Sequence, residues 1–242
     1  DVLALTKLSA GATLIPSAAN STKLTSSPVV TVNGNRYRGN NYVLDGAMNS
    51  NSNNSGEPAI VPSIESIEEV QVQTNNFSSE FGRGNGAVIN LRTKTGTNQF
   101  HGRLWEFHRN AAMNARNFFA TSRPPLVFNQ FGGNLGGPIK KDRAHFFFNY
   151  DGQRSTTNNI VAFGNTPAAT DTVGTTAFNR LLQQFGASYP RSFNQDVYLG
   201  KVDWQVDNAN RLSVRYNRQE FTGVNLENGG ATSAQERSGN SL

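Results

Sequence analysis

The sequence predicts a mainly β protein in two parts: a small N-terminal α/β domain over residues 1–97, then the first antiparallel strands of an incomplete transmembrane β-barrel over residues 98–242. Two observations carry this prediction. After Thr97 the chain shows segments of alternating apolar and polar residues, each about ten residues long, the length a tilted strand needs to cross a bilayer. The connections between these segments also alternate in length, as they do in outer-membrane barrels.

Short apolar stretches predict the strands of the N-terminal part. They lie at Val29–Val32, Asn41–Leu44, residues 67–72 and Val88–Thr93, and the third continues a strand-like stretch that begins at residue 64. Between the last two stands Phe81-Gly-Arg-Gly-Asn-Gly86. Glycines at alternate positions would each cost a helix roughly 1 kcal/mol, but they suit a turn with positive φ. The segment therefore predicts strand, turn, strand, which also argues against a dinucleotide-binding motif, because that motif must open a helix.

Five segments predict the membrane-spanning strands: residues 100–109, 127–135, 144–154, 196–206 and 211–221. Most of them gather aromatic and aliphatic side chains on one face and polar side chains on the other. In the first segment Trp105 and Phe107 share a face with Arg103 and Arg109. Aromatic residues near strand ends suit the interfacial girdle of a barrel, and Trp105, Tyr150 and Trp204 are the candidates.

The connections are long over residues 110–126 and 155–195, and short over residues 136–143 and 207–210. A barrel keeps its short turns on one rim and its long loops on the other, whereas a soluble β-sandwich has no reason to sort them. Within the longest connection, apolar residues fall at helical spacing from Phe178 to Phe185, with Gly186 as a C-cap. A short helix is expected there.

Composition narrows the classes of function. The 242 residues include no Cys and 16% charged residues, and the mean hydropathy is −0.51. No apolar run approaches the roughly 18 residues of a membrane-spanning helix. The net charge of +5 is scattered, with a cluster only at Lys140, Lys141 and Arg143, so no nucleic-acid partner is expected. The first residues carry no signal peptide, which predicts a mature or truncated chain.

Residues with catalytic or metal-binding potential are poorly arranged for it. His101 and His108 are seven residues apart on one strand, so they point to opposite faces. We expect no catalytic residues, no metal site and no cofactor. Arg36 and Arg38 could grip an anionic ligand through their guanidinium groups, or they could be ordinary exposed loop charges.

Four motifs together resemble one family. They are Asn41-Tyr-Val-Leu-Asp-Gly46, the stretch at residues 64–72, Glu80-Phe-Gly-Arg-Gly84 and Val88-Ile-Asn-Leu-Arg-Thr-Lys-Thr-Gly-Thr-Asn98. This combination is similar to the end of the plug domain of TonB-dependent outer-membrane receptors, in their Oar-like branch. One departure stands out: many members follow the first strand with Arg-Gly-Pro, whereas this chain has Gln73-Thr-Asn-Asn76. A salt bridge made by that arginine is therefore not carried over.

The resemblance implies a fold, a location and partners. Residues 1–97 would be a plug inside a large barrel in the bacterial outer membrane, in contact with its lipid, and the chain would be a fragment with further strands downstream. A solute would bind from outside and be imported with energy from a TonB-type inner-membrane complex. The contact motif for that complex precedes the plug in the family, so no coupling residue is named in this chain.

The same correspondence places the loop after Asp45-Gly46 at the outward-facing tip of the plug. That loop is rich in Asn and Ser and favours turns, and it supplies the expected solute-contact residues: Asn49, Ser50, Asn51, Asn53 and Asn54, together with Arg36 and Arg38. A plain mobile loop is the alternative for this segment. The ligand class stays open among siderophores, cobalamin, other small molecules, oligosaccharides and peptides.

Two other functions remain open from the sequence. The same architecture could serve as a surface adhesion or structural barrel of the outer membrane. A soluble carbohydrate-binding β-domain is the second alternative, since a β-sandwich also alternates apolar and polar residues along its strands.

Overall fold

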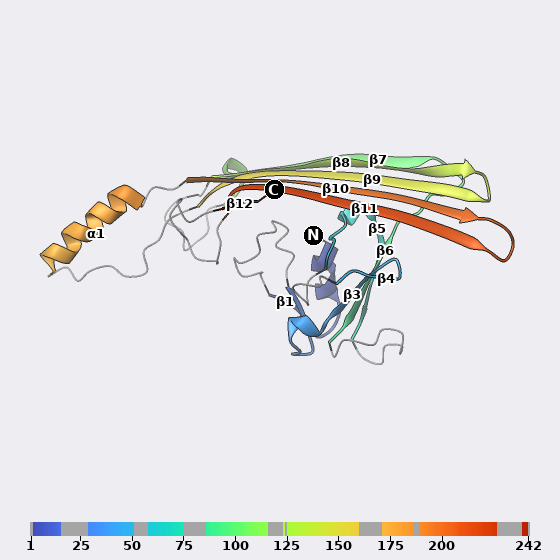
Figure 1. The fold of residues 1–242 in the computed structure, drawn as a ribbon, viewed down its shortest axis with the longest axis horizontal. Helices are drawn as coiled ribbons and strands as arrows, with labels where there is room; N and C mark the ends of the chain where they lie inside the picture. Colours follow the sequence, from blue (N-terminus) through green and yellow to red (C-terminus); the bar gives the residue numbers. More distant parts are fainter. Residues whose placement is uncertain are drawn as a thin grey trace.

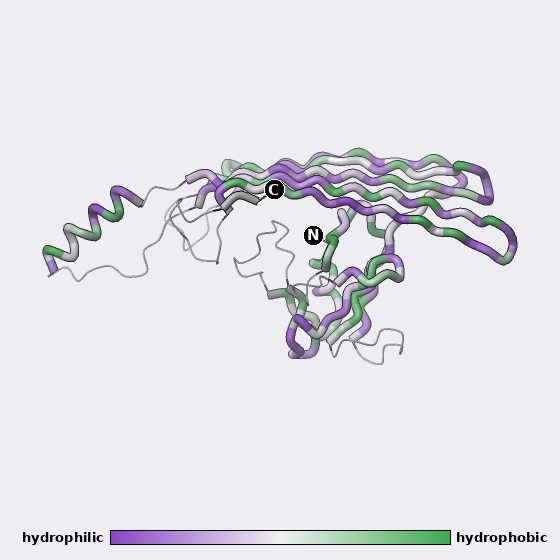
Figure 2. The backbone as a smooth tube through the Cα atoms, viewed as in Figure 1, coloured by the Kyte–Doolittle hydropathy of each residue, from purple (hydrophilic) through white to green (hydrophobic). Residues whose placement is uncertain are grey.

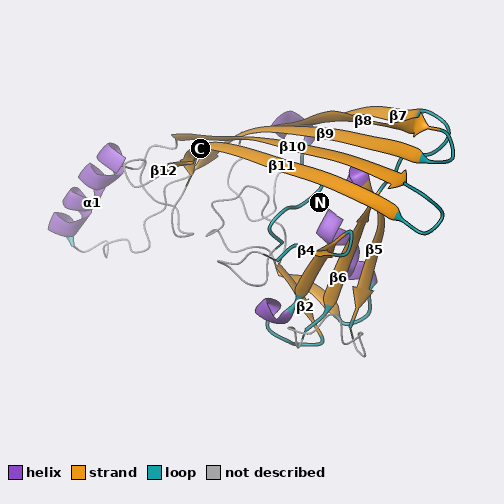
Figure 3. Cartoon of the chain, turned by 45° about the vertical axis from the view of Figure 1, so that its right-hand side comes forward, coloured by secondary structure: helices purple, strands orange, loops and turns teal. Residues whose placement is uncertain are grey.

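The computed structural model of the protein describes residues 2–15, 29–50, 58–74, 86–115, 123, 125–159, 171–185, 189–226 and 239–241. Its dominant feature is a long, curved antiparallel sheet with the N-terminal elements gathered on one side of it (Figure 1). A four-stranded sheet stands at a steep angle to this long sheet (Figure 3). The arrangement gives the long sheet one face toward the N-terminal elements and one face away from them.

The N-terminal elements combine short 3-10 helices with short strands. A helix η1 (Val2–Leu8) is followed by the antiparallel pair β1 (Ala12–Ile15) and β2 (Val29–Val32), and then by η2 (Tyr37–Gly39). The four-stranded sheet has the order β4-β3-β6-β5, with β3 parallel to β6 and the other pairs antiparallel. Its elements are β3 (Asn41–Leu44), β4 (Ala47–Met48), β5 (Ile67–Gln73) and β6 (Val88–Thr93).

The four predicted N-terminal strands are confirmed, with one correction. Residues 64–66 were expected to belong to the third strand, but Ile64–Ser66 form a 3-10 helix, η3. The cause is Ser63, whose Oγ accepts a hydrogen bond from the backbone N–H of Glu65 and caps the turn at 3.3 Å. The glycine-rich turn predicted at residues 81–85 lies outside the described residues.

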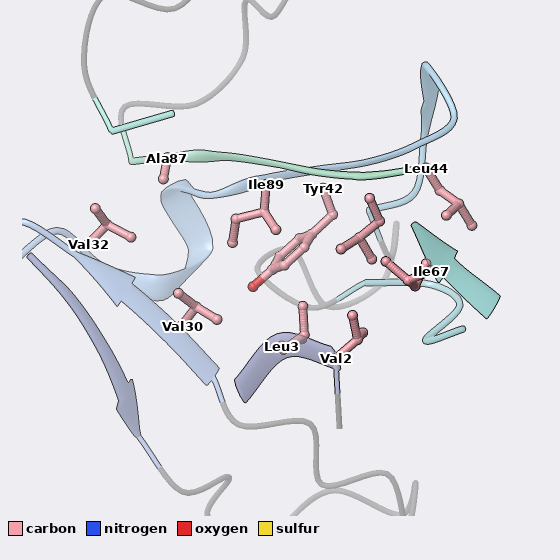
Figure 4. Close-up of a cluster of buried hydrophobic side chains, with 10 residues drawn as sticks. Val2, Leu3, Val30, Val32, Tyr42, Leu44, Ile67, Ala87 and Ile89 are labelled. Carbon is pink, nitrogen blue, oxygen red and sulfur yellow. The ribbon is translucent and has the colours of Figure 1, made fainter. Parts of the chain in front are cut away.

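A single apolar core holds the N-terminal elements together. Tyr42 of β3 and Ile89 of β6 meet Leu3 of η1 and Val30 of β2 in its centre (Figure 4). All of its buried members come from these elements: Val2, Leu3, Val30, Val32, Tyr42, Leu44, Ile67, Ala87, Ile89 and Leu91. Within the part of the chain that the structure describes, the core is therefore closed on itself and takes no side chain from the long sheet.

The long sheet joins six strands in sequence order, each antiparallel to the next. They are β7 (His101–Asn110), β8 (Leu126–Lys140), β9 (Ala144–Asn159), β10 (Tyr189–Gln205), β11 (Arg211–Leu226) and β12 (Gly239–Ser241). The five predicted membrane strands correspond to β7–β11, but β8–β11 run longer than expected, at 15 to 17 residues each. The connection predicted at residues 136–143 therefore shrinks to the turn at residues 141–143, where Asp142 has a φ of 62°.

Hydrophilic and hydrophobic residues alternate along the strands of the long sheet (Figure 2), so its two faces differ in chemistry. We call the face toward the N-terminal elements the inner face. It buries polar and charged side chains together with apolar ones: Asp151, Gln195, Lys201, Trp105, Phe147 and Leu199. The opposite, outer face exposes a band of apolar side chains: Leu104, Phe131, Leu135, Phe148, Val202, Trp204, Leu212, Val214 and Tyr216. An exposed apolar band over a polar interior is typical of strands that face lipid.

Trp105 corrects the predicted aromatic girdle. It lies on the inner face, only 8% exposed, where its ring covers Gly132 on β8. Its indole Nε1 has no hydrogen-bond partner among the described residues. Tyr150 and Trp204 lie on the outer face, and their place in a girdle stays a prediction. The alternation in β7 placed Trp105 and Arg103 together correctly, but it could not tell which side would face the N-terminal elements.

The helix expected in the long connection is present as α1 (Thr172–Phe185). Asp171 starts it, because its Oδ1 accepts a hydrogen bond from the backbone N–H of Gly174 at 2.8 Å. In the view of Figure 1, α1 lies beyond the β9 and β10 ends of the long sheet. Among the described residues, no helix has both the length and the hydropathy needed to cross a membrane.

Leu91 offers a test of the closed core. It is 0% exposed on β6, between β3 and β5, so Leu91→Ala should destabilise the N-terminal elements by about 2–5 kcal/mol through lost burial and a residual cavity. Hydrogen–deuterium exchange should accelerate in β3, β5 and β6 and stay unchanged in β9 and β10. Gln71→Ala, an exposed substitution on the same sheet, is the control; equal effects of the two variants would contradict a closed core.

Candidate functional site between the N-terminal elements and the long sheet

A tight turn presents Asp45 to the inner face of the long sheet. Asp45 and Gly46 connect β3 to β4 and both have positive φ, 48° and 82°. Two successive residues with positive φ are the signature of a two-residue hairpin turn of type I′, for which Asp-Gly is a favoured sequence. Because β3 is buried along its whole length, the turn starts from a well-packed strand, which holds the Asp45 carboxylate in place.

The Asp45 carboxylate is the centre of a polar cluster that joins both parts of the chain. Its Oδ1 accepts the backbone N–H of Thr93 at 2.7 Å, and its Oδ2 accepts the Thr93 hydroxyl at 2.6 Å. From the long sheet, Arg215 donates to Oδ2 at 2.8 Å and to the carbonyl of Leu44 at 2.6 Å. Lys201 places its Nζ 3.7 Å from Oδ1 and 3.3 Å from the Thr93 hydroxyl.

The cluster is well shielded from solvent. The side chains of Lys201, Asp45 and Arg215 are 8%, 14% and 19% exposed. Burial on its own raises the pKa of Asp45, but the hydrogen bonds from Thr93 and Arg215 and the charge of Lys201 outweigh it and leave the pKa below its ordinary value of 3.8. Asp45 is therefore ionised at neutral pH and attracts two cations of the long sheet.

A second polar contact lies farther along the inner face. The hydroxyl of Ser63 donates to Asp151 Oδ2 at 2.9 Å, and Gln130 donates to the same oxygen at 2.8 Å. Gln153 donates to the other oxygen, Oδ1, at 3.1 Å. Asp151 is 0% exposed, and among the described residues these neutral donors are its side-chain partners.

Glu65, two residues after Ser63, adds a third contact. Its carboxylate meets Arg103 of β7 at 2.9 Å, and its backbone carbonyl accepts from Asn134 of β8 at 3.2 Å. Lys94 donates to the same carbonyl at 2.8 Å. Arg103 is 61% exposed, so this ion pair is weaker than the buried Asp45 cluster.

The segment that leads from β6 into β7 is fastened to the turn between β8 and β9. Asn98 accepts the backbone N–H of Asp142 at 2.8 Å, lies 2.8 Å from His145 Nε2, and donates to the Asp142 carboxylate. Two residues earlier, Gly96 runs so close to the carbonyl of Gly137 that a Cβ would lie 2.8 Å from that oxygen. A glycine is required at this position by the close approach of the two backbones.

The residues predicted to contact solute fall into three groups. Asn49 is buried and binds the backbone of Ile60 through both side-chain atoms, at 2.8 and 3.0 Å; Ser50 accepts the backbone N–H of Tyr42 at 3.2 Å. Arg36 and Arg38 are exposed around η2. Asn51, Asn53 and Asn54 lie outside the described residues. The structure does not bring the arginines and Asn49 into one described cluster, so solute contact stays a prediction.

Sequence reasoning missed the residues that join the two parts: Asp45, Ser63, Thr93, Asp151, Lys201 and Arg215. A signal was present, because Asp45 stands inside a quoted motif and Lys201 and Arg215 stand on the polar sides of their strands. The described residues hold no group of three or more His, Cys, Asp or Glu side chains arranged to bind a metal.

Comparisons with known proteins agree with this architecture. Residues 92–185 match the family model described as an outer membrane beta barrel domain. The TonB-dependent transporter Oar of Myxococcus xanthus is 33% identical over 126 residues, which cover 49% of this chain and 12% of that protein. The chain thus spans a small part of the length of this relative.

Solved structures share the fold at low sequence identity. A variant of the ferric enterobactin receptor of Pseudomonas aeruginosa has a TM-score of 0.62 and 14% identity, with 99% of this chain and 33% of that chain covered. The outer membrane transporter YddB of Escherichia coli gives 0.61 and 14%, over 92% and 31%. The siderophore receptor PirA of Acinetobacter baumannii gives 0.56 and 17%, over 91% and 29%.

The predicted resemblance is confirmed by these matches. The motifs of β3, β5 and β6, the exposed apolar band on β7–β11 and the similarity to an Oar transporter agree with one another. The chain is a relative of the TonB-dependent outer-membrane receptors, in their Oar-like branch, and its location is the bacterial outer membrane.

Proposed function

We propose that this chain is part of a transporter that binds a solute outside the cell and imports it through the outer membrane with energy from a TonB-type inner-membrane complex. Residues 1–97 act as a plug domain, and residues 98–242 supply the first strands of a barrel completed by further sequence. Neither catalysis nor a cofactor is part of this proposal.

One observation carries the proposal: the long sheet exposes an apolar band on its outer face, whereas its charged and polar side chains are buried on the inner face, where the N-terminal elements dock. A barrel wall needs this distribution, because lipid lies on one side and an aqueous lumen on the other. Phe148 and Val214, exposed by 47% and 55%, stand on the outer face, whereas Asp151 and Lys201 are buried on the inner face. A soluble carbohydrate-binding domain would leave this apolar band in water, which argues against that alternative.

The contacts between the two parts suit a plug that moves. They are hydrogen bonds and ion pairs at Asp45, Ser63 and Glu65, whereas the apolar core of the N-terminal elements is closed on itself. Separation of the two parts would replace these polar contacts with water and leave the apolar core packed. The inner face also carries buried apolar side chains, among them Trp105, Phe147 and Leu199, so the cost of opening includes the apolar surface that the N-terminal elements cover there.

The solute would meet the loop that follows β4 and the exposed arginines of η2. Asn49 and Ser50 anchor the start of this loop through Ile60 and Tyr42. Asn51, Asn53 and Asn54 then offer amide donors and acceptors, while Arg36 and Arg38 suit an anionic group. The relatives include proteins described as siderophore receptors, but the polar character of the loop fits several solute classes.

Uptake measurements test the transport function. Cells that lack this protein should lose accumulation of one solute among siderophores, cobalamin, oligosaccharides and peptides, and an uncoupler of the inner membrane should abolish the same accumulation in wild-type cells. Arg36→Gln with Arg38→Gln, compared with Arg211→Gln at a site away from η2, should weaken accumulation of an anionic solute. Unchanged uptake of all these solutes, with a loss of cell–cell or surface attachment, would favour the adhesion alternative.

Asp45→Asn tests the docking of the plug. The substitution leaves Lys201 and Arg215 buried without their counter-charge, and losing one partner of a buried ion pair costs about 3–5 kcal/mol. Hydrogen–deuterium exchange at the turn between β3 and β4 should therefore accelerate strongly at pH 7. Asp207→Asn, in the exposed turn between β10 and β11, is the control and should leave that exchange unchanged.

The same variant tests the pH dependence. Because the pKa of Asp45 is lowered in the folded protein, its stabilising effect is fully present above its ordinary value of 3.8 and is lost as the pH falls through the lower folded value. Exchange at this turn should be constant from pH 7 to about 4, after correction for the intrinsic rate, and rise below that in the wild type. Asp45→Asn should remove most of the rise; a wild-type change between pH 7 and 5 would contradict this assignment.

A further inference from the structure

Gly200 is unusual among the glycines of the long sheet. A Cβ at Gly132 would lie 2.7 Å from the ring of Trp105, and one at Gly133 would lie 2.6 Å from Leu104. At glycines such as these, a neighbouring side chain occupies the space that a Cβ would need. At Gly200 no described atom lies within 4 Å of the point that a Cβ would occupy.

The space above Gly200 is a notch in the outer face of about 350 Å³. Gly200 forms its floor, and the strands on either side raise Phe148 of β9 and Tyr216 of β11 as walls, because both residues pair directly with Gly200. The next row along the strands adds the remaining outer-face lining residues, Phe146, Val202 and Val214. The notch therefore runs along the strand direction.

The chemistry of the notch is apolar throughout. Lys201 borders it only through the backbone, because its ammonium group lies on the other side of the sheet with Asp45 and Thr93. No charged side chain of the described residues therefore reaches into it from the outer face. A polar ligand would lose its hydration there without gaining hydrogen bonds, which is unfavourable.

We infer that this notch binds a single acyl chain of an outer-membrane lipid. The outer face is the lipid-facing side. Barrel strands cross the bilayer at a tilt of about 35–45°, so an acyl chain, which is flexible, follows the groove at that inclination. A chain in the notch contacts Phe148 and Tyr216 on two sides and the backbone of Gly200 beneath, whereas a chain elsewhere on the band touches one surface only. Because the chain is already in hydrocarbon, its preference for the notch comes from the larger number of dispersion contacts.

Photo-crosslinking in the native membrane tests the inference in the full-length protein. Replacing Tyr216 with p-benzoylphenylalanine keeps an aromatic wall and captures the nearest C–H bond on illumination, and the adduct is identified by mass spectrometry. The same replacement at Leu135 is the matched position, because Leu135 is exposed on the same face, lies in the same row across the strands as Phe148, Gly200 and Tyr216, and is outside the notch. We expect about threefold more lipid adduct at position 216 than at position 135, a ratio that about five additional carbon–carbon contacts account for.

Gly200→Leu supplies the second arm. The side chain has free space, so the sheet should fold, which resistance to SDS at room temperature would verify. Filling the notch should reduce the lipid adduct at position 216 to the yield found at position 135, while position 135 stays unchanged. Equal yields at the two positions before filling, or an adduct at position 216 with a protein in place of a lipid, would overturn the inference.

Discussion

The structure depends on one sheet whose two faces suit different surroundings, lipid on the outer face and polar groups on the inner face. Strands β7–β11 alternate side chains so that one face suits hydrocarbon and the other suits water and charge, and backbone hydrogen bonds between the strands are satisfied within the sheet. The outer band, the polar inner face and the place where the N-terminal elements dock all follow from that alternation. A shift of one residue in β10, for example, would send Lys201 toward lipid and Val202 toward Asp45.

At the inner face, each buried carboxyl group finds its hydrogen-bond or ion-pair partners close by. Asp45 collects Lys201 and Arg215, whereas Asp151 is satisfied by neutral donors such as Ser63. Two anions in the same interface are thus stabilised in different ways. The first gains from attraction to cations on the other part of the chain, and the second keeps most of its hydrogen bonds within its own sheet.

Much of this fold could be predicted from the sequence because its signals are local. The period of two along β9, β10 and β11 identified their apolar faces, and alternating glycines argued for strands on both sides of a turn. The 3-10 helix at residues 64–66 was missed because it depends on one capping hydroxyl, that of Ser63. The strand β8 was cut short at Gly136 and Gly137, because paired glycines resemble a turn, whereas the side chains of His101 and Phe100 occupy the space beside them in the sheet.

The site was harder to predict, because its contacts join residues far apart in the sequence. Asp45 and Arg215 are separated by 170 positions. The local sequence around either residue does not indicate that the two are in contact. Trp105 shows the same difficulty. The pattern in β7 grouped it correctly with Arg103, but the side that faces the N-terminal elements is decided by the docking of Glu65 on that strand.

The attachment of Asn98 to the turn between β8 and β9 has a mechanical consequence. Asn98 fixes the N-terminal elements to one rim of the wall, and the Asp45, Glu65 and Ser63 contacts follow at increasing distance along the strands. A force that tilts the N-terminal elements about Asn98 loads these contacts one after another. A force directed along the interface would load all of them at once. For the same total work, breaking the contacts in sequence needs a lower peak force than breaking them together. A modest force can therefore separate an interface that is stable against thermal opening.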